Sequence, residues 1–296
     1  MEKINSKSGI YPGCSLEGTA SAFETSLEKA LDALNADYSV MEDWNCCGAT
    51  SAHALDHSLY LGLAARNLQR AEKQGYQNII APCAACYNRL ANANLKLTGE
   101  DDLLKHVNEE ADLDYNGTIH VLNVLDYLVN TVGLERIAQK VVRPLNDLKI
   151  VSYYGCLNTR VPRLEPFDDV ENPTSMDRIV RALGAETPDW SYKTECCGAS
   201  LFVTSEKVAT KLSSKILKDA VAREADCIAV ACPMCHNNLD TLQKDMRAAY
   251  GISKPMPVLF VTQLMGLAYG MTAKEMKIDT AFVPFAFPEK TGEHIS

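Results

Sequence analysis

WNCCGATSA (Trp44–Ala52) has a second copy, TECCGASLF (Thr194–Phe202), and this repeat organises the whole chain. Each copy holds two adjacent cysteines and a glycine, with one cysteine upstream and a C-x2-C pair downstream. The full patterns are C-x31-CC-x35-C-x2-C and C-x39-CC-x34-C-x2-C, and only Cys227 among the cysteines falls outside them. The first set is Cys14, Cys46, Cys47, Cys83 and Cys86, and the second is Cys156, Cys196, Cys197, Cys232 and Cys235.

The sequence around the cysteines repeats as well. IYPGCSLEGT (10–19) and SYYGCLNTRV (152–161) share their Tyr, Gly and Cys. IIAPCAACYNRL (79–90) and AVACPMCHNNL (229–239) share C-x-x-C-x-N-x-L. Agreement at three separate places indicates two copies of one structural unit. We expect a first unit with a helical linker over residues 1–142, and a second unit with a C-terminal tail over 143–296.

Short apolar runs that end at a cysteine alternate with longer stretches of helical periodicity. We expect strands at 10–13, 37–41, 78–81, 149–155 and 227–231, and helices at 16–35, 52–74, 101–113, 120–131, 176–183 and 207–224. This alternation predicts an α/β fold of two pseudo-symmetric units, each a small, mostly parallel sheet flanked by helices. Ligands of such sheets sit at the carboxyl ends of the strands, and we expect the cysteines there. Backbone N–H groups and helix dipoles at those ends favour thiolate.

Composition narrows the class of protein. The 296 residues are 47% hydrophobic and 23% charged, which suffices for real cores without a metal or disulfide staple. The net charge of −9 argues against broad nucleic-acid binding and against a polybasic membrane contact. We see no secretory signal and no apolar run long enough to span a membrane, so we expect a cytoplasmic protein. Thiols stay reduced there, and a regular cysteine pattern then indicates metal binding or catalysis.

Five cysteines per unit exceed what one zinc ion needs, because a tetrahedral site takes four ligands. Two of the five are adjacent, and neighbouring side chains diverge, which strains a single-ion site. In a multi-iron cluster, adjacent thiolates can bind different irons. Thiolates suit iron–sulfur clusters as well as zinc, and the closely spaced cysteines of ordinary ferredoxins are missing. The residues therefore favour iron–sulfur clusters, with zinc in one unit as the alternative.

From Cys14 to at least Leu239, the chain resembles the CCG-domain (cysteine-rich domain) family, most closely the B subunit of heterodisulfide reductase. Two complete five-cysteine motifs carry the resemblance. It implies one non-cubane [4Fe–4S] cluster on each cysteine set, at the carboxyl ends of the strands, with no motif cysteine missing. It also implies that the two clusters face each other and that a disulfide substrate is cleaved between them.

The resemblance implies an oxidoreductase acting on a sulfur group, with the mixed disulfide of coenzymes M and B as the family's substrate. Electrons would come from a ferredoxin-like subunit of the C type, fed by a flavin subunit of the A type. One alternative is a sulfur-oxidising relative that acts on sulfur carried by lipoate. Another is a CCG-domain subunit that transfers electrons without disulfide chemistry.

Further residues near the cysteines admit two interpretations each. Glycines next to cysteines in both copies indicate close backbone approach to a cluster, against a plain turn: Gly13, Gly48, Gly155 and Gly198. Asn88 and Asn237 could bond near the cluster or only satisfy the backbone. His236, beside Cys235, is a weak candidate for the proton donor to a departing thiolate, whereas His53 has no counterpart.

Three basic residues, an unmatched cysteine and the tail complete the set of candidates. Arg160, Arg163 and Lys193 could hold an anionic substrate, against the interpretation that they are solvated surface charges. Cys227 lies inside an apolar run and is expected in the core. The apolar tail Thr280–Pro288 either packs on its own core or docks on a partner.

Overall fold

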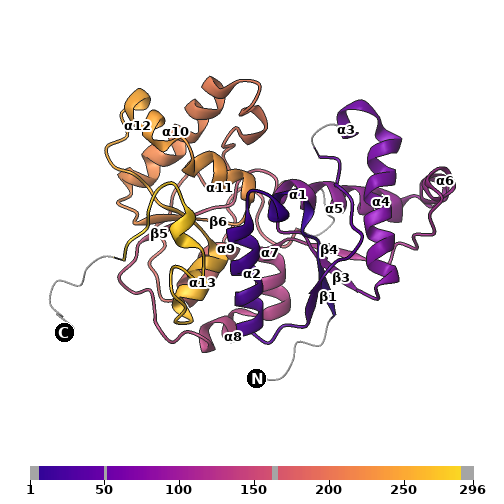
Figure 1. The fold of residues 1–296 in the computed structure, drawn as a ribbon, viewed down its shortest axis with the longest axis horizontal. Coiled ribbons are helices and arrows are strands. Elements are labelled where there is room, and N and C mark those ends of the chain that lie inside the picture. The colour runs from indigo at the N-terminus through magenta and orange to yellow at the C-terminus, as the bar shows by residue number, and fades with distance from the viewer. Residues whose placement is uncertain (1–6, 50–51, 162–165, 288–296) are drawn as a thin grey trace.

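A computed structural model describes residues 7–49, 52–161 and 166–287 (Figure 1). The first half builds a four-stranded sheet in the order β2-β1-β3-β4, in which all neighbouring strands are parallel. Its strands are β1 (Ser8–Ile10), β2 (Tyr38–Val40), β3 (Asn78–Ile80) and β4 (His120–Leu122). Ile79 and Ile80 are fully buried, so the centre of this sheet is part of the core.

The second half repeats this sheet with one strand reduced to a single bridge. Its strands, β5 (Ile150–Tyr153), β6 (Cys227–Val230) and β7 (Val258–Phe260), pair in parallel in that order. A parallel bridge between Lys149 and Glu186 stands beside β5, where β2 stands beside β1. Two parallel sheets flanked by helices confirm the predicted α/β class.

Helices cover both sheets. Those of the first half are α1 (Gly13–Glu17), α2 (Ser21–Ala33), α3 (Ala52–Leu55), α4 (His57–Lys73), α5 (Ala84–Gly99), α6 (Asp101–Ala111), α7 (Val124–Asp126), the π-helical η1 (Tyr127–Val132) and α8 (Leu134–Gln139). Those of the second half are α9 (Ser175–Ala182), η2 (Ala199–Leu201), α10 (Glu206–Ala222), α11 (Pro233–Asp240), α12 (Gln243–Tyr250), α13 (Val261–Ala268) and η3 (Ile278–Thr280). None of these described helices is long and apolar enough to cross a bilayer.

The expected helix over 120–131 is wrong in its first turn. Residues His120–Leu122 form β4, which pairs in parallel with β3 and adds the fourth strand. The helix starts only at Val124, because the Asn123 side chain accepts the backbone N–H of Asp126 at 2.8 Å and caps it. Val121 is buried in the sheet, so tertiary pairing overrides local helical periodicity here.

The two halves share one core. Helix α2 of the first half lies alongside α13 of the second in the middle of the molecule (Figure 1). Phe23 stacks on Phe260 with ring centroids 4.3 Å apart, and the hydroxyls of Ser26 and Thr262 lie 2.6 Å apart. The division at residue 142 stays a prediction, and the apolar core runs across it.

The tail packs on its own chain over the part that the structure describes. The Asp240 carboxylate accepts the backbone N–H groups of Phe282 and Val283 at 2.8 and 2.9 Å. Val283 is buried, and Arg143 lies over the ring of Phe287 at 4.5 Å. Pro288 lies outside the described residues. These contacts support the first of the two interpretations of this segment.

The shared core predicts that a substitution in α2 weakens the whole molecule. Phe23→Ala removes a fully buried ring and is expected to lower the free energy of unfolding by about 3–5 kcal/mol. Phe282→Ala removes a ring that is 71% exposed and should change it by about 0.5 kcal/mol or less. Urea denaturation followed by circular dichroism measures both. Equal effects from the two variants would contradict the packing described for α2.

Candidate functional site

The first cysteine set stands at the carboxyl ends of three neighbouring strands. Cys14 lies in α1, directly after β1. Cys46 and Cys47 lie in the segment that follows β2, while Cys83 and Cys86 follow β3 at the start of α5. Because parallel strands end at the same edge of a sheet, residues far apart in the sequence meet there.

These five thiols lie close together. The Sγ atoms of Cys47 and Cys86 are 3.4 Å apart, and Cys86 also hydrogen-bonds to Cys83. Burial, and then the nearby charges of Cys46, Cys47 and Cys83, raise the pKa of Cys14. The structure therefore brings all five predicted residues of the first set into one site.

The second set repeats the arrangement. Cys156 follows β5, and Cys232 and Cys235 stand at the start of α11. The Sγ atoms of Cys197 and Cys235 are 3.7 Å apart, and Cys235 hydrogen-bonds to Cys232. Burial, and then the charges of Cys196 and Cys197, raise the pKa of Cys156 to about 11. All five predicted residues of this set are again together.

Each site has a buried floor and an open side. Six of the patterned thiols are buried, whereas Cys14, Cys46 and Cys196 are exposed and Cys156 is half-buried. The first cysteine of each adjacent pair is exposed in both units, whereas Cys14 is more exposed than its counterpart Cys156. Cys46 and Cys196 leave each site accessible at the surface.

Hydrogen bonds lower the pKa of buried thiols in each site, and hydrogen bonding with Cys86 lowers that of Cys47. Hydrogen bonding with Cys86, together with backbone N–H groups at the start of α5, lowers the pKa of Cys83 to about 6. Hydrogen bonding with Cys235 lowers the pKa of Cys197 to about 7. The pKa values of Cys86 and Cys235 rise, because each hydrogen-bonds with two cysteines of its own set and is buried. Thiolates are the form that binds metals.

Two glycines in each unit approach the sulfurs. Gly13 and Gly155 have φ values of +59° and +69°, and a Cβ there would lie 3.1 Å from Cys86 Sγ and 2.9 Å from Cys235 Sγ. The N–H groups of Gly48 and Gly198 donate to Sγ of the first cysteine in each adjacent pair, at 3.5 and 3.3 Å. The geometry supports close backbone approach over a plain turn at all four glycines.

Two tyrosines support the sites, although the sequence analysis did not single them out. The fully buried Tyr11 and Tyr153 donate their hydroxyls to the backbone oxygens of Asn45 and Glu195, at 2.7 and 2.6 Å. Each bond ties the end of a strand to the residue directly before the adjacent cysteines. A signal is present in the sequence, because both tyrosines stand two residues before the repeated Gly-Cys.

An asparagine of the second site was also missed. The buried Asn238 donates its Nδ2 to the backbone oxygen of Cys197 at 2.5 Å and to Ser213 Oγ at 3.2 Å. The predicted candidates Asn88 and Asn237 instead bond one helical turn onward, to Asn92 and Thr241. The sequence repeat matches Asn88 with Asn237, whereas the neighbouring Asn238 makes the hydrogen bond to Cys197.

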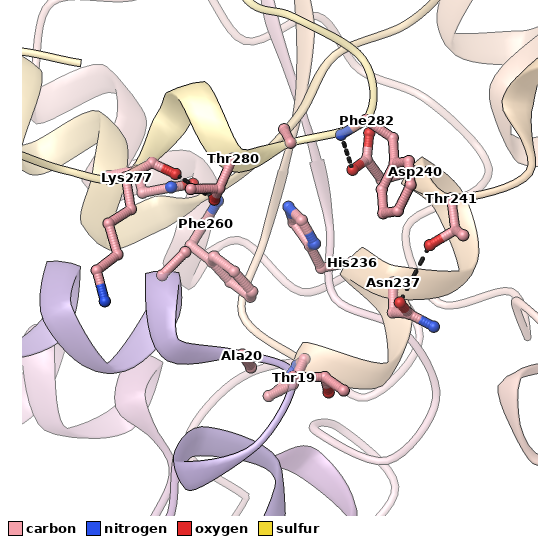
Figure 2. Close-up of a pocket in the computed structure, with 14 residues that line it drawn as sticks. Thr19, Ala20, His236, Asn237, Asp240, Thr241, Phe260, Lys277, Thr280 and Phe282 are labelled. Carbon is pink, nitrogen blue, oxygen red and sulfur yellow. Dashed lines mark hydrogen bonds between the residues drawn. The ribbon is translucent and has the colours of Figure 1, made fainter. Parts of the chain in front are cut away.

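His236 faces a pocket that none of the cysteines lines. Its imidazole projects from α11 between Phe260 and Asp240 (Figure 2) and stacks on Phe260 with ring centroids 4.4 Å apart. Burial lowers its pKa, against the opposing effects of Asp240 and a hydrogen bond to the backbone of Val258. The cavity measures about 80 Å³. The role of His236 as a proton donor therefore stays a prediction. The contacts described for its side chain are with Phe260 and the pocket rather than with the cysteines.

The basic residues that were candidates for holding a substrate have different environments. Arg160 is exposed, and Arg163 lies outside the described residues. Lys193 is buried and pairs with Asp177, so the expectation of a solvated charge is wrong for it. Cys227 is fully buried in β6, which confirms its expected place in the core, and burial raises its pKa. The side chain of His53 is outside the described part of the structure.

The donor sets suit a soft metal group. Each offers five thiols, backbone N–H groups directed at sulfur and a glycine whose missing side chain leaves room beside a buried Sγ. Thiolate donors select iron–sulfur centres or zinc, and hydrogen bonds to sulfur are typical of iron–sulfur sites. Within the described residues, no three Cys, His, Asp or Glu side chains have the geometry of a single-ion site. The residues present therefore fit a metal group bound by thiolates.

Two parallel-sheet units, each gathering five cysteines at one sheet edge, define a duplicated α/β protein with one thiol site per unit. A family model described as a cysteine-rich domain, CCG, matches residues 8–91 and 150–240, which contain all ten patterned cysteines. The chain belongs to this CCG family, as its motifs predicted.

Relatives cover nearly the whole chain. It is 33% identical to the 8-methylmenaquinol:fumarate reductase membrane anchor subunit of Wolinella succinogenes, over 91% of this chain and 94% of that one. It is 31% identical to the B subunit of the ferredoxin/F(420)H(2)-dependent CoB-CoM heterodisulfide reductase of Methanosarcina acetivorans, over 92% of each. A crystal structure of a hypothetical Helicobacter pylori protein shares the fold, with a TM-score of 0.77 and 14% identity, over 96% of this chain and 53% of that one. The predicted resemblance to the heterodisulfide reductase B subunit is confirmed.

The close approach of Gly155 to Cys235 gives a test of the site's geometry. Gly251 also has a left-handed φ, +65°, but a Cβ there would meet nothing within 4 Å. Gly251→Ala should therefore cost about 1–2 kcal/mol of stability, from its backbone conformation alone. Gly155→Ala adds the collision with Cys235 Sγ, so we expect it to cost about 1–3 kcal/mol more. Equal losses in urea denaturation would show that Cys235 moves aside freely.

Proposed function

We propose that this chain is an iron–sulfur subunit of the heterodisulfide reductase B type, in which each cysteine set holds one non-cubane [4Fe–4S] cluster. The observation that carries the proposal is the gathering of five thiols at each sheet edge, with a sulfur-directed N–H in each. Relatives named as B subunits of heterodisulfide reductases support the same assignment.

Zinc in one unit is the alternative metal. Both sets keep the adjacent cysteine pair, one member open and the other buried against the C-x2-C cysteines. Side chains that point in different directions suit a group with several metal atoms better than one tetrahedral ion. The two units are also alike in their tyrosine and glycine contacts, which favours the same group in both.

The chemistry proposed is cleavage or formation of a disulfide, written RS–SR′ + 2 e⁻ + 2 H⁺ → RSH + R′SH in the reductive direction. Iron–sulfur clusters usually move one electron each, and metal-bound sulfur is stabilised as thiolate. The chain's own part is to hold the two sites close together and open to a substrate. Leu157 and Met234, which adjoin Cys156 and Cys235, pack against the core that contains the first cysteine set. Side chains next to the second cysteine set therefore reach the core of the first unit.

A partner must deliver the electrons. The chain has no closely spaced ferredoxin cysteine run and no G-x-G-x-x-G nucleotide motif. We propose a ferredoxin-like iron–sulfur subunit as the direct donor and a flavin subunit behind it. Relatives named as lettered subunits of heterodisulfide reductases support the existence of partner subunits, and the kind of partner follows from the resemblance to that family.

A second candidate function is electron transfer without disulfide chemistry. It is favoured by the relative whose name refers to menaquinol and fumarate, which matches this chain at 33% identity. A sulfur-oxidising subunit that acts on lipoate-bound sulfur would use the same cysteine sites as the heterodisulfide reductase type. The three candidate functions share the two clusters and differ in what approaches the open side.

Metal analysis tests the cofactor assignment. Protein purified without oxygen should contain about eight irons and a similar amount of acid-labile sulfide per chain, because two four-iron clusters are expected. Colorimetric iron and sulfide assays, with elemental analysis for zinc, measure this. About four irons with one zinc would support the alternative for one unit, and zinc without iron would end the proposal.

Turnover of a small disulfide separates the candidate functions. Iron-loaded protein supplied with reduced methyl viologen should cleave a small mixed disulfide and release both thiols, as the balanced reaction requires. Thiol release and viologen oxidation are followed together, with a protein-free reaction as the background. A Cys197→Ala variant removes a buried ligand candidate and should lose this activity, whereas Cys227→Ala should keep it. Clusters that are reduced but release no thiol would favour the electron-transfer candidate.

A further inference from the structure

The two units differ in charge at one equivalent position. Three residues before the adjacent cysteines stands Asp43 in the first unit and Lys193 in the second. Asp43 is exposed, whereas Lys193 is buried with 6% of its surface exposed. The equivalent residue is therefore an exposed acid in the first unit and a buried base in the second, although the cysteines that follow it are alike.

Lys193 is buried in an ion pair at the start of α9. Its Nζ lies 3.4 Å from Asp177 Oδ2 and donates to the backbone oxygen of Pro173 at 3.0 Å. Asp177 is itself only 1% exposed. A buried ammonium is stable only when paired in this way, so the position of Lys193 is tied to that of the helix.

The fully buried Tyr154 completes the network. Its hydroxyl donates to Asp177 Oδ2 at 2.6 Å and accepts the backbone N–H groups of Met176 and Asp177 at 2.8 and 3.1 Å. The N–H groups of Tyr154 and Gly155 both donate to the backbone oxygen of Lys193, at 2.9 and 3.1 Å. The strand end that leads into Cys156 is therefore joined to the segment that leads into Cys196.

The first unit lacks this network. Pro12 stands where Tyr154 stands, and has no hydroxyl. Asp43 pairs at the surface with Arg66 and Arg70, each at 2.9 Å. The segment before Cys46 and Cys47 must therefore be held by other side chains.

Asn67 of α4 is fully buried and bonds twice to that segment. Its Oδ1 accepts the backbone N–H of Asn45 at 2.9 Å, and its Nδ2 donates to the Asn45 oxygen at 3.0 Å. Helices α4 and α10 have the same length of 17 residues, and Ile216 stands at the place of Asn67 when they are aligned from their first residues. The second unit therefore has no asparagine at the matching position.

We infer that Lys193, Asp177 and Tyr154 form a positioning network for the second cysteine set alone, and that Asn67 does the same for the first set. The network holds Cys156 and Cys196 in register by joining the two segments that lead into them. This inference rests on the proposed function, because it assigns the network to one of the two proposed clusters. None of the network residues is a ligand, so they act through the backbone.

The matched variants are Lys193→Met for the second unit and Asn67→Leu for the first. Lys193→Met should lower the iron content from about eight to about four per chain, and Asn67→Leu should do the same. The remaining electron paramagnetic resonance signal should differ between them. In Lys193→Met the remaining signal should come from the first cluster and match that of Cys197→Ala. In Asn67→Leu it should come from the second cluster and match that of Cys47→Ala.

A further variant separates positioning from simple misfolding. Lys193→Met alone leaves the Asp177 charge buried without its partner, which can unfold the chain. Lys193→Met with Asp177→Asn removes both charges and keeps an acceptor for Tyr154, so circular dichroism should show a native fold. We still expect selective loss of the second cluster in this folded variant. Retention of about eight irons, or equal loss from both clusters, would overturn the inference.

The wild-type protein distinguishes this failure from that of the proposed function. If it contains about eight irons while the folded double variant keeps them, only the positioning network is wrong. If the wild-type protein contains no iron, the proposed function falls and the inference falls with it.

Discussion

The structure depends on one geometric constraint, that neighbouring parallel strands end at the same edge of a sheet. The first unit places three cysteine-bearing segments after three such strands, and the second places them after two strands and the bridge at Glu186, so thiols far apart in the sequence meet. Three-residue strands suffice for this in the first sheet, because β1 and β3 are paired on both sides and buried. The hydrogen bonds of Tyr11 and Tyr153 then set how far each cysteine segment stands from its strand.

Much of this arrangement could be predicted from the sequence. The repeated cysteine spacing indicates two units, and the apolar runs before the cysteines indicate strands that deliver them. The sequence also distinguishes Cys227 correctly from the metal-ligand candidates as a core residue, because it stands inside an apolar run without a counterpart in the first unit. These predictions succeed because spacing and periodicity are local, and the parallel sheet converts them directly into position.

The failures concern contacts between segments that no local pattern relates. The sequence predicts a helix where β4 stands, since the identity of β4 depends on pairing with β3. It predicts a surface charge at Lys193, because the carboxylate that makes its burial possible belongs to a different segment, helix α9. It singles out Asn237 and not Asn238, because which of two adjacent helical residues faces Cys197 depends on how α11 packs. Tertiary partners, rather than residue type, decide each of these cases.

The shared core has a consequence for the proposed chemistry. Two one-electron centres can act on one S–S bond only if their separation is fixed, since a hinge between them would let the substrate contact one centre at a time. The pairing of α2 with α13 opposes such a hinge, because the stacked Phe23 and Phe260 and the hydroxyls of Ser26 and Thr262 join the two halves. The different positioning side chains of the two units then act in halves that this core joins. Two similar sites that are held by unlike residues can differ in metal retention and in redox behaviour, and a reaction that moves two electrons in sequence can use that difference.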